Sequence, residues 1–151
     1  MAHRLALATL GVTCILILLG GLVTNTGAAL AVPDWPSTFG YNMVLFPWSR
    51  MAGGILYEHS HRLMGALVGL LTLVLAGVLW REGGRLRRLG LLAVAAVVSQ
   101  GALGGLRVVL LEDTLAIFHG CLAQAFFALL AVITLLTAPR GRFPPHRSSR
   151  R

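Results

Sequence analysis

The stretch LAIFHGCLAQAFFALLAVITLLTA, residues 115–138, decides the fold class. Its 24 residues include no Asp, Glu, Lys or Arg, and His119 and Cys121 are its only ionisable side chains. A helix needs about 20 predominantly apolar residues to cross the hydrocarbon core of a bilayer. Because a segment in lipid must satisfy its own backbone hydrogen bonds, we predict a transmembrane helix here.

Three further helices are expected before this one, over residues 5–23, 54–80 and 89–109. A signal peptide is the alternative for the first, but the apolar part of a signal peptide is only about 7–15 residues long. We therefore predict an all-α membrane protein in which residues 1–138 form a four-helix transmembrane bundle. Residues 139–151 are expected to form a basic, disordered tail.

The charges of the chain predict its orientation. Charged residues make up 12% of the sequence, about half the share of a soluble domain. All 13 basic residues are Arg, and ten of them lie in residues 1–4, 81–88 and 140–151. The positive-inside rule therefore places both termini in the cytoplasm. The basic balance is explained by topology, and no nucleic-acid partner is expected.

Two histidines are the main functional candidates. His61 is expected about two turns into the second helix and His119 about one turn into the fourth, at similar depth near the outer face. In an up-down-up-down bundle these two helices are diagonal neighbours, so the two imidazoles can face each other. This arrangement suits a haem iron with two axial histidines. Ionisable residues inside a membrane are functional candidates by default.

The glycines near these histidines allow two interpretations. Glycine beside a ligand lets a flat macrocycle approach the backbone, but small residues also let membrane helices pack closely without any cofactor. Gln100, Gly104 and Arg107 share one stripe of the third helix. The tripeptide Gly-Gly-Leu occurs at 20–22 and again at 104–106, each time before a loop and a helix that carries a histidine. The repeat fits a doubled helix pair around a central site.

Glu58 lies one turn before His61 and has two open interpretations. It is either a partner of the imidazole and an acid or base near a cofactor, or an interfacial carboxylate paired with Arg62. Arg50, Arg62 and Arg107 are the only outer cations, and haem propionates facing the outer water would need such partners. Trp35 and Trp48 lie in the long outer loop. An interfacial aromatic belt is the preferred interpretation of both, and a specific functional role is the alternative.

Four stretches carry a resemblance to a known family. They are GGLVTNTGAALAVPDWP (20–36), YEHSHRLMG (57–65), QGALGGLRVV (100–109) and FHG (118–120). With these motifs the sequence resembles the haem A synthase family. Its members usually have eight helices in two similar halves, and this chain resembles the N-terminal half.

The resemblance implies a function and a set of site residues. It implies that His61 and His119 ligate haem iron, that Glu58 is catalytic, and that a ring methyl of haem O is oxidised to the formyl group of haem A for cytochrome oxidase. The expected cofactor is haem, as haem b, haem O or haem A. The cofactor-binding set comprises the two histidines with Arg62, Gln100 and Arg107.

The expected setting is a prokaryotic cytoplasmic membrane. The expected partners are membrane lipid, the substrate haem O, haem O synthase, an electron donor and further copies of this chain. Many relatives carry a cysteine pair in the first outer loop, where this chain has none, so the identity of the electron donor stays open. The alternatives are a haem b protein that transfers electrons without oxygenase activity, and a cofactor-free accessory subunit of a respiratory complex.

Overall fold

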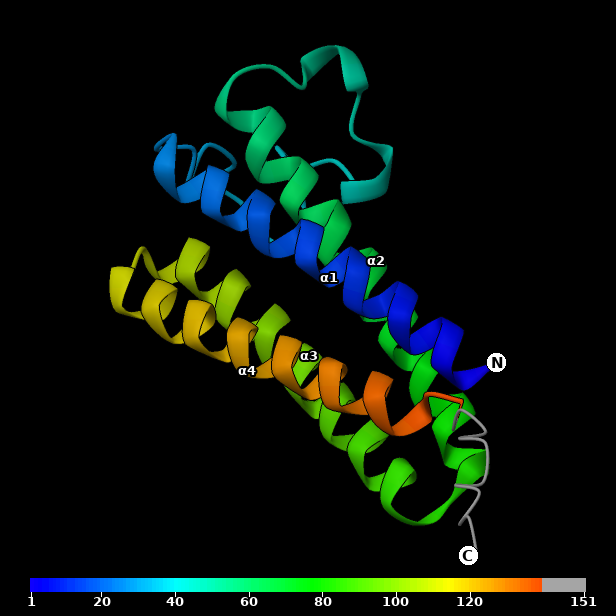
Figure 1. The fold of residues 1–151 in the computed structure, drawn as a ribbon. Helices are drawn as coiled ribbons and strands as arrows, with labels where there is room; N and C mark the ends of the chain where they lie inside the picture. The colour runs from blue at the N-terminus through cyan, green and yellow to red at the C-terminus, as the bar shows by residue number, and fades with distance from the viewer. Residues whose placement is uncertain (140–151) are drawn as a thin grey trace, which may run out of the picture.

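The computed structural model describes residues 1–139 as four long helices joined by one long loop and two short connections (Figure 1). The helices are α1 (Ala2–Asn25), α2 (Gly54–Glu82), α3 (Gly84–Leu110) and α4 (Asp113–Thr137). All four are long and apolar enough to cross a membrane, which confirms the prediction of an all-α, multi-pass membrane protein. Apart from Pro139, the tail expected at 139–151 lies outside the described residues.

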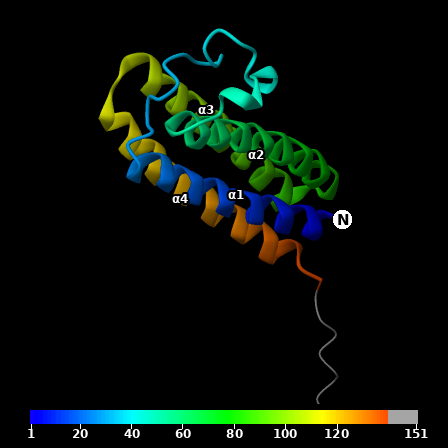
Figure 2. The same ribbon diagram turned by 90° about the horizontal axis from the view of Figure 1, so that it is seen from above.

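The helices form a ring in chain order. α1 contacts α2 and α4, and α3 contacts the same two helices, so α2 and α4 lie across the diagonal of the bundle. We call the end that carries Met1, the α2–α3 turn and Pro139 the terminal end. The opposite end, which carries the long α1–α2 loop, is the loop end (Figures 1 and 2). The diagonal placement of the two histidine-bearing helices therefore agrees with the sequence prediction.

The turn between α2 and α3 depends on glycine. Gly83 is the only residue between the two helices, and its φ of 74° lies in the left-handed region. Side chains with a β-carbon rarely adopt this conformation, whereas glycine does so without steric cost. The tight turn makes α2 and α3 antiparallel neighbours.

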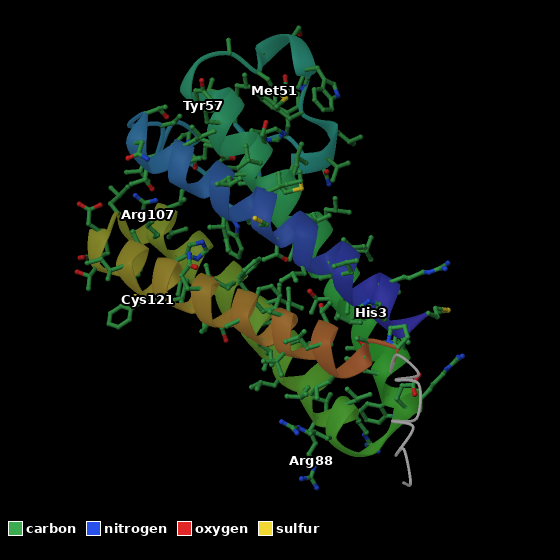
Figure 3. The ribbon with its side chains drawn as sticks, viewed as in Figure 1. His3, Met51, Tyr57, Arg88, Arg107 and Cys121 are labelled. Atoms are coloured by element: carbon green, nitrogen blue, oxygen red, sulfur yellow. The ribbon has the colours of Figure 1, made fainter. Side chains whose placement is uncertain are left out.

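The packed apolar core lies in the terminal half of the bundle. Its buried side chains come from all four helices: Ala6, Val68, Leu75, Leu79, Ala93, Phe126, Leu130 and Ile133. Buried threonines beside this core donate to a carbonyl one turn earlier, as Thr13 does to Thr9 at 2.7 Å. His3 joins α1 to α4, because its Nδ1 lies 3.0 Å from the carbonyl oxygen of Thr134 (Figure 3). The loop half of the bundle has a different interior, which contains the two histidines.

The α1–α2 loop, residues 26–53, contains two short 3-10 turns, η1 (Met43–Leu45) and η2 (Trp48–Arg50). η1 packs against α2. Figure 2 shows the loop leaving α1, passing the end of α3 and returning to α2. The loop therefore reaches both helix pairs, α1–α2 and α3–α4.

Candidate functional site

The two predicted histidines lie together inside the loop half of the bundle. His61 of α2 and His119 of α4 approach across the diagonal, and their ring centroids are 6.4 Å apart with an angle of 74° between the ring planes. Neither side chain is exposed. The structure thus brings together the two imidazoles that the sequence placed at similar depth.

A glycine of the preceding helix lies against each imidazole. A β-carbon added to Gly20 of α1 would lie 3.0 Å from Cε1 of His61, and one added to Gly104 of α3 would lie 3.2 Å from Cε1 of His119. Both glycines are the first residue of the repeated Gly-Gly-Leu tripeptide. The two helix pairs therefore build the site with the same element, a glycine that makes room for a histidine on the next helix.

Polar atoms without partners gather at this site. Nδ1 of His61, Nδ1 of His119 and Oε1 of Gln100 are the buried side-chain nitrogen and oxygen atoms without a hydrogen-bond partner in residues 1–139. The amide nitrogen of Gln100 donates to the carbonyl oxygen of His119 at 3.0 Å, which fixes α3 to α4 at the histidine. Because buried polar groups are nearly always paired, a cluster of unpaired ones indicates a place for a ligand or water.

Glu58 and Arg62 hold a short segment of the loop, residues 32–37, which we call the strap. The guanidinium of Arg62 donates to the carbonyl oxygens of Val32 (2.9 Å), Asp34 (2.6 Å) and Ser37 (3.1 Å). It also forms an ion pair with Oε1 of Glu58 at 2.6 Å. The other carboxylate oxygen of Glu58 accepts the backbone N–H of Val32 at 2.9 Å. Both side chains are therefore occupied by the strap and by each other.

Trp35 joins the strap to α3. A β-carbon on Gly105 would overlap the six-membered ring of Trp35, so the indole rests directly on the backbone of that glycine. The neighbouring Gly104 lies against His119, so two adjacent glycines receive an indole and an imidazole. The first copy of the repeat differs here, because a β-carbon on Gly21 would meet nothing within 4 Å. From the sequence, an aromatic belt was the preferred interpretation of Trp35, and this contact was not predicted. The adjacent glycines at 104 and 105 were the one sequence feature that indicated a close approach to α3.

Asp34 organises the far side of the strap. Its carboxylate accepts hydrogen bonds from the backbone N–H groups of Phe39 (2.7 Å) and Gly40 (2.9 Å) and from the hydroxyl of Ser37. Partial desolvation raises the pKa of Asp34, but these donors outweigh it and lower the pKa to about 2. The carboxylate is therefore ionised at neutral pH and closes a compact turn.

His59 of α2 has a structural role, since it contacts the loop, and it is not part of the histidine pair. It is 1% exposed, its Nδ1 lies 3.1 Å from the hydroxyl of Thr38, and its ring centroid is 5.0 Å from that of Phe46. The side chain thus fixes the loop against α2.

Arg107 differs from Arg62 in having no ion-pair or side-chain hydrogen-bond partner among residues 1–139. It lies at the loop end of α3 (Figure 3) and makes no ion pair or side-chain hydrogen bond within residues 1–139. Arg107 is three residues after Gly104, whose backbone lies against His119. Arg107 is therefore the cation near the histidine pair that can receive an anion without breaking an existing contact.

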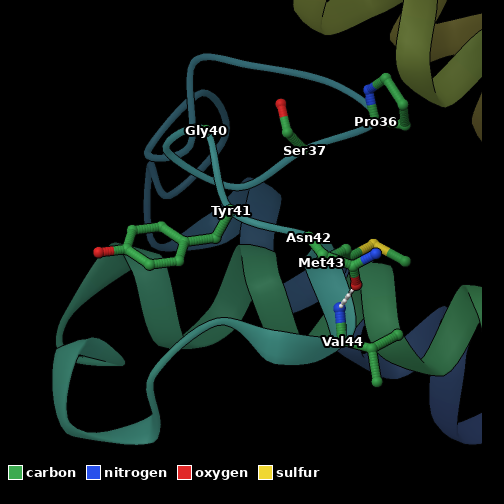
Figure 4. A pocket seen from close by; sticks show the side chains of 7 residues that line it. All are labelled: Pro36, Ser37, Gly40, Tyr41, Asn42, Met43 and Val44. Atoms are coloured by element: carbon green, nitrogen blue, oxygen red, sulfur yellow. Dashed lines mark hydrogen bonds between the residues drawn. The ribbon is translucent and has the colours of Figure 1, made fainter.

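Two other features of the molecule are weaker candidates for a site. A shallow hollow in the loop is lined by Pro36, Ser37 and residues 40–44, and there the side chain of Asn42 accepts the N–H of Val44 (Figure 4). No cluster of three or more His, Cys, Asp or Glu side chains suited to a bare metal ion occurs in the part of the chain that the structure describes. The histidine pair is thus the stronger candidate.

The comparisons with known proteins agree with the motifs. The model of the COX15-CtaA family, described as cytochrome oxidase assembly protein, matches residues 3–151. A heme A synthase of Shouchella clausii is 33% identical over 148 residues, which cover 92% of this chain and 48% of that protein. One of Alkalihalophilus pseudofirmus is 33% identical over 134 residues (85% and 43%). One of Granulibacter bethesdensis is 30% identical over 142 residues (89% and 36%).

The matches cover most of this chain but only part of each relative. The chain spans about half the length, or less, of the curated relatives it matches. No solved structure matches the chain.

Proposed function

The chain belongs to the COX15-CtaA family of cytochrome oxidase assembly proteins, and we propose that it is a haem A synthase that binds haem between His61 and His119. Its setting is a bacterial membrane, which the four spanning helices and the relatives support. The observation that carries the proposal is the geometry of the histidine pair.

The residues present fit a haem that would be held by two histidines. Metal–imidazole bonds of about 2 Å, with half an imidazole ring added on each side, put the two ring centres roughly 6 Å apart. The observed separation is 6.4 Å. The unpaired Nδ1 atoms agree with a site that takes a ligand between the two rings. His61 and His119 would therefore hold the iron.

The remaining residues of the site would bind the haem or orient the groups that bind it. We propose Arg107 as the partner of a haem propionate, because its guanidinium has no other partner among the described residues. Arg62 has four hydrogen bonds already, so its proposed part in cofactor binding is indirect, through the strap. Gln100 acts through the carbonyl group of His119.

The proposed reaction oxidises one ring methyl of the substrate haem O to a formyl group, through successive hydroxylations at one carbon and loss of water. Each hydroxylation would take one oxygen atom from dioxygen, while the other atom leaves as water with two protons and two electrons from an electron donor. A bound haem would supply the iron redox chemistry. Glu58 is the proposed catalytic carboxylate. Its two oxygens accept from Arg62 and from the backbone N–H of Val32, which hold the carboxylate in place beside the strap.

The proposed topology puts the terminal end in the cytoplasm. Of the Arg residues in the described part of the chain, five lie at the terminal end: Arg4, Arg81, Arg85, Arg87 and Arg88. Arg50, Arg62 and Arg107 lie at the loop end. By the positive-inside rule the histidine site then lies in the outer leaflet.

Self-association is also proposed. Gly11, Gly21 and Gly101 are exposed, and a β-carbon on any of them would meet nothing within 4 Å. Exposed glycines on membrane helices favour close helix–helix contact, and two-fold assembly is the commonest outcome for identical chains. Native mass spectrometry in mild detergent tests this, and a monomer with full activity would contradict it.

One experiment tests the function. The chain is expressed with a source of haem O, and the haems are extracted and separated by chromatography. Haem A is expected with the wild-type chain and not with His61→Ala. Bound haem b without haem A would favour the electron-transfer alternative, and a protein without haem absorbance would favour the accessory subunit.

A further inference from the structure

The strap is held from both sides of the bundle. On the α2 side, Arg62 donates three hydrogen bonds to the strap backbone and Glu58 accepts one from it. The two side chains also form an ion pair with each other. On the α3 side, the indole of Trp35 lies on Gly105. The strap thus bridges the α1–α2 pair and the α3–α4 pair at the loop end, as the path of the loop in Figure 2 shows.

These attachments lie next to the histidine pair in the sequence and in space. Arg62 follows His61 directly. Gly105 follows Gly104, whose backbone lies against His119. The strap is therefore fastened beside His61 on α2 and beside the glycine that contacts His119 on α3. Val32 at the start of the strap is 0% exposed, which shows that the segment is seated on the bundle.

The histidine site is closed differently at its two ends. Towards the terminal end, the apolar core that includes Leu75, Phe126 and Leu130 fills the bundle. Towards the loop end the helices bury fewer apolar side chains beyond Gly20 and Gly104, namely Val23 of α1 and Val108 of α3. The strap also lies at this end, where it contacts α2 and α3.

We propose that Trp35 is a positioning residue that fastens the strap to Gly105 and so keeps water on the loop side away from the histidine pair. The exclusion of water rests on the proposed function, because it matters for the reaction only if haem is bound at the histidine pair. The contact between Trp35 and Gly105 does not depend on haem. Trp35 acts through the strap, since its indole contacts Gly105 and not the imidazoles. The Glu58–Arg62 pair is the second fastening.

The chain offers matched controls for a test. Gly105→Ala puts a methyl group where the indole lies, whereas Gly21→Ala, at the same place in the first repeat, meets nothing within 4 Å. Trp35→Ala removes the fastening, whereas Trp48→Ala removes a Trp that is 77% exposed in the same loop. Trp35→Phe keeps an aromatic ring that can stack on Gly105.

The first measurement is hydrogen exchange of the strap in the purified protein, which does not depend on haem. The Val32 amide, held by Glu58, is expected to exchange about tenfold faster in Gly105→Ala and Trp35→Ala, because exchange reports local opening. Gly21→Ala and Trp48→Ala should keep the wild-type rate, and Trp35→Phe should recover most of it. Equal rates in all five variants would overturn the fastening.

The second measurement tests the cover over the histidines. In protein isolated with haem, Trp35→Ala should lower the haem midpoint potential, because water stabilises the more charged ferric form. In protein isolated without haem, diethyl pyrocarbonate should modify His61 and His119 about tenfold faster in Trp35→Ala than in Trp48→Ala, because the opened strap admits the reagent. An unchanged potential, or unchanged modification rates, would overturn the cover. Absence of haem together with faster modification would contradict the proposed function and leave the cover supported.

Discussion

Gly104 lies so close to the imidazole of His119 that a β-carbon on it would stand 3.2 Å from Cε1. Gly104→Ala should therefore push the ring and weaken haem binding by about tenfold, or about 1.4 kcal/mol, the lower part of the cost of overpacking, about 1–3 kcal/mol. Haem titration followed by absorbance measures this. Gly101→Ala, on the same helix with nothing within 4 Å, is the control and should bind like wild type. Equal affinities of the two variants would contradict the role of Gly104.

The histidine pair makes a prediction that can be rescued chemically. His61→Gly should weaken haem binding by more than the roughly 10–100-fold that loss of an outer-shell partner costs a metal site, because it removes a ligand itself. Free imidazole added to the buffer should restore the two-imidazole absorbance spectrum by occupying the vacated space. His3→Gly, which removes an imidazole at the terminal end, should keep the wild-type spectrum. Normal haem binding by His61→Gly would show that this residue is not a ligand.

The fold could be predicted from the sequence because apolar length and charge decide it. Four stretches that are apolar and long enough for a bilayer leave few alternatives, and the order of short and long connections makes α2 and α4 diagonal. The expected helix bounds also predicted that His61 and His119 lie at a similar depth in the membrane. The repeated Gly-Gly-Leu tripeptide indicated the doubled helix pair, although its physical meaning, a glycine against each imidazole, needed coordinates.

The loop could not be predicted in the same way. Its structure depends on single hydrogen bonds between distant residues, such as those from Arg62 to carbonyl groups of the strap. No periodicity encodes such contacts. The sequence also left open whether Glu58 pairs with Arg62 or serves a cofactor. The ion pair is present at 2.6 Å, but it is buried and holds the strap, a combination that neither interpretation included.

Glu58→Gln separates the holding role of Glu58 from its proposed catalytic role. The variant keeps the size of the side chain and removes its charge, so we expect bound haem to be retained and haem A formation to be lost. Chromatography of extracted haems measures the product, and absorbance measures the bound haem. Glu82→Gln, at an exposed carboxylate of the terminal end, should leave both unchanged. Undiminished haem A formation by Glu58→Gln would leave Glu58 with the strap alone.

The orientation predicts which positions can be labelled from outside the cell. In a background with Cys14→Ala and Cys121→Ala, both native thiols are removed. A membrane-impermeant maleimide should then label Ser49→Cys, in the exposed η2 turn, in intact cells. It should label Glu82→Cys only after the membrane is permeabilised. Labelling of Glu82→Cys in intact cells would reverse the proposed topology.

Asp34 predicts how the loop responds to acid. Its folded-state pKa of about 2 lies below the ordinary value of 3.8, so its contribution to the stability of the loop is complete above pH 3.8 and is lost as the pH falls towards 2. The emission of Trp35, next to Asp34, should report this transition in a Trp48→Phe and Trp80→Phe background. Asp34→Asn cannot ionise, and its side-chain oxygen can accept from fewer of the three donors, so its loop should already be loosened at neutral pH and should change little between pH 4 and 2. An acid transition that is the same with Asp34 and with Asn at this position would show that another group controls the loop.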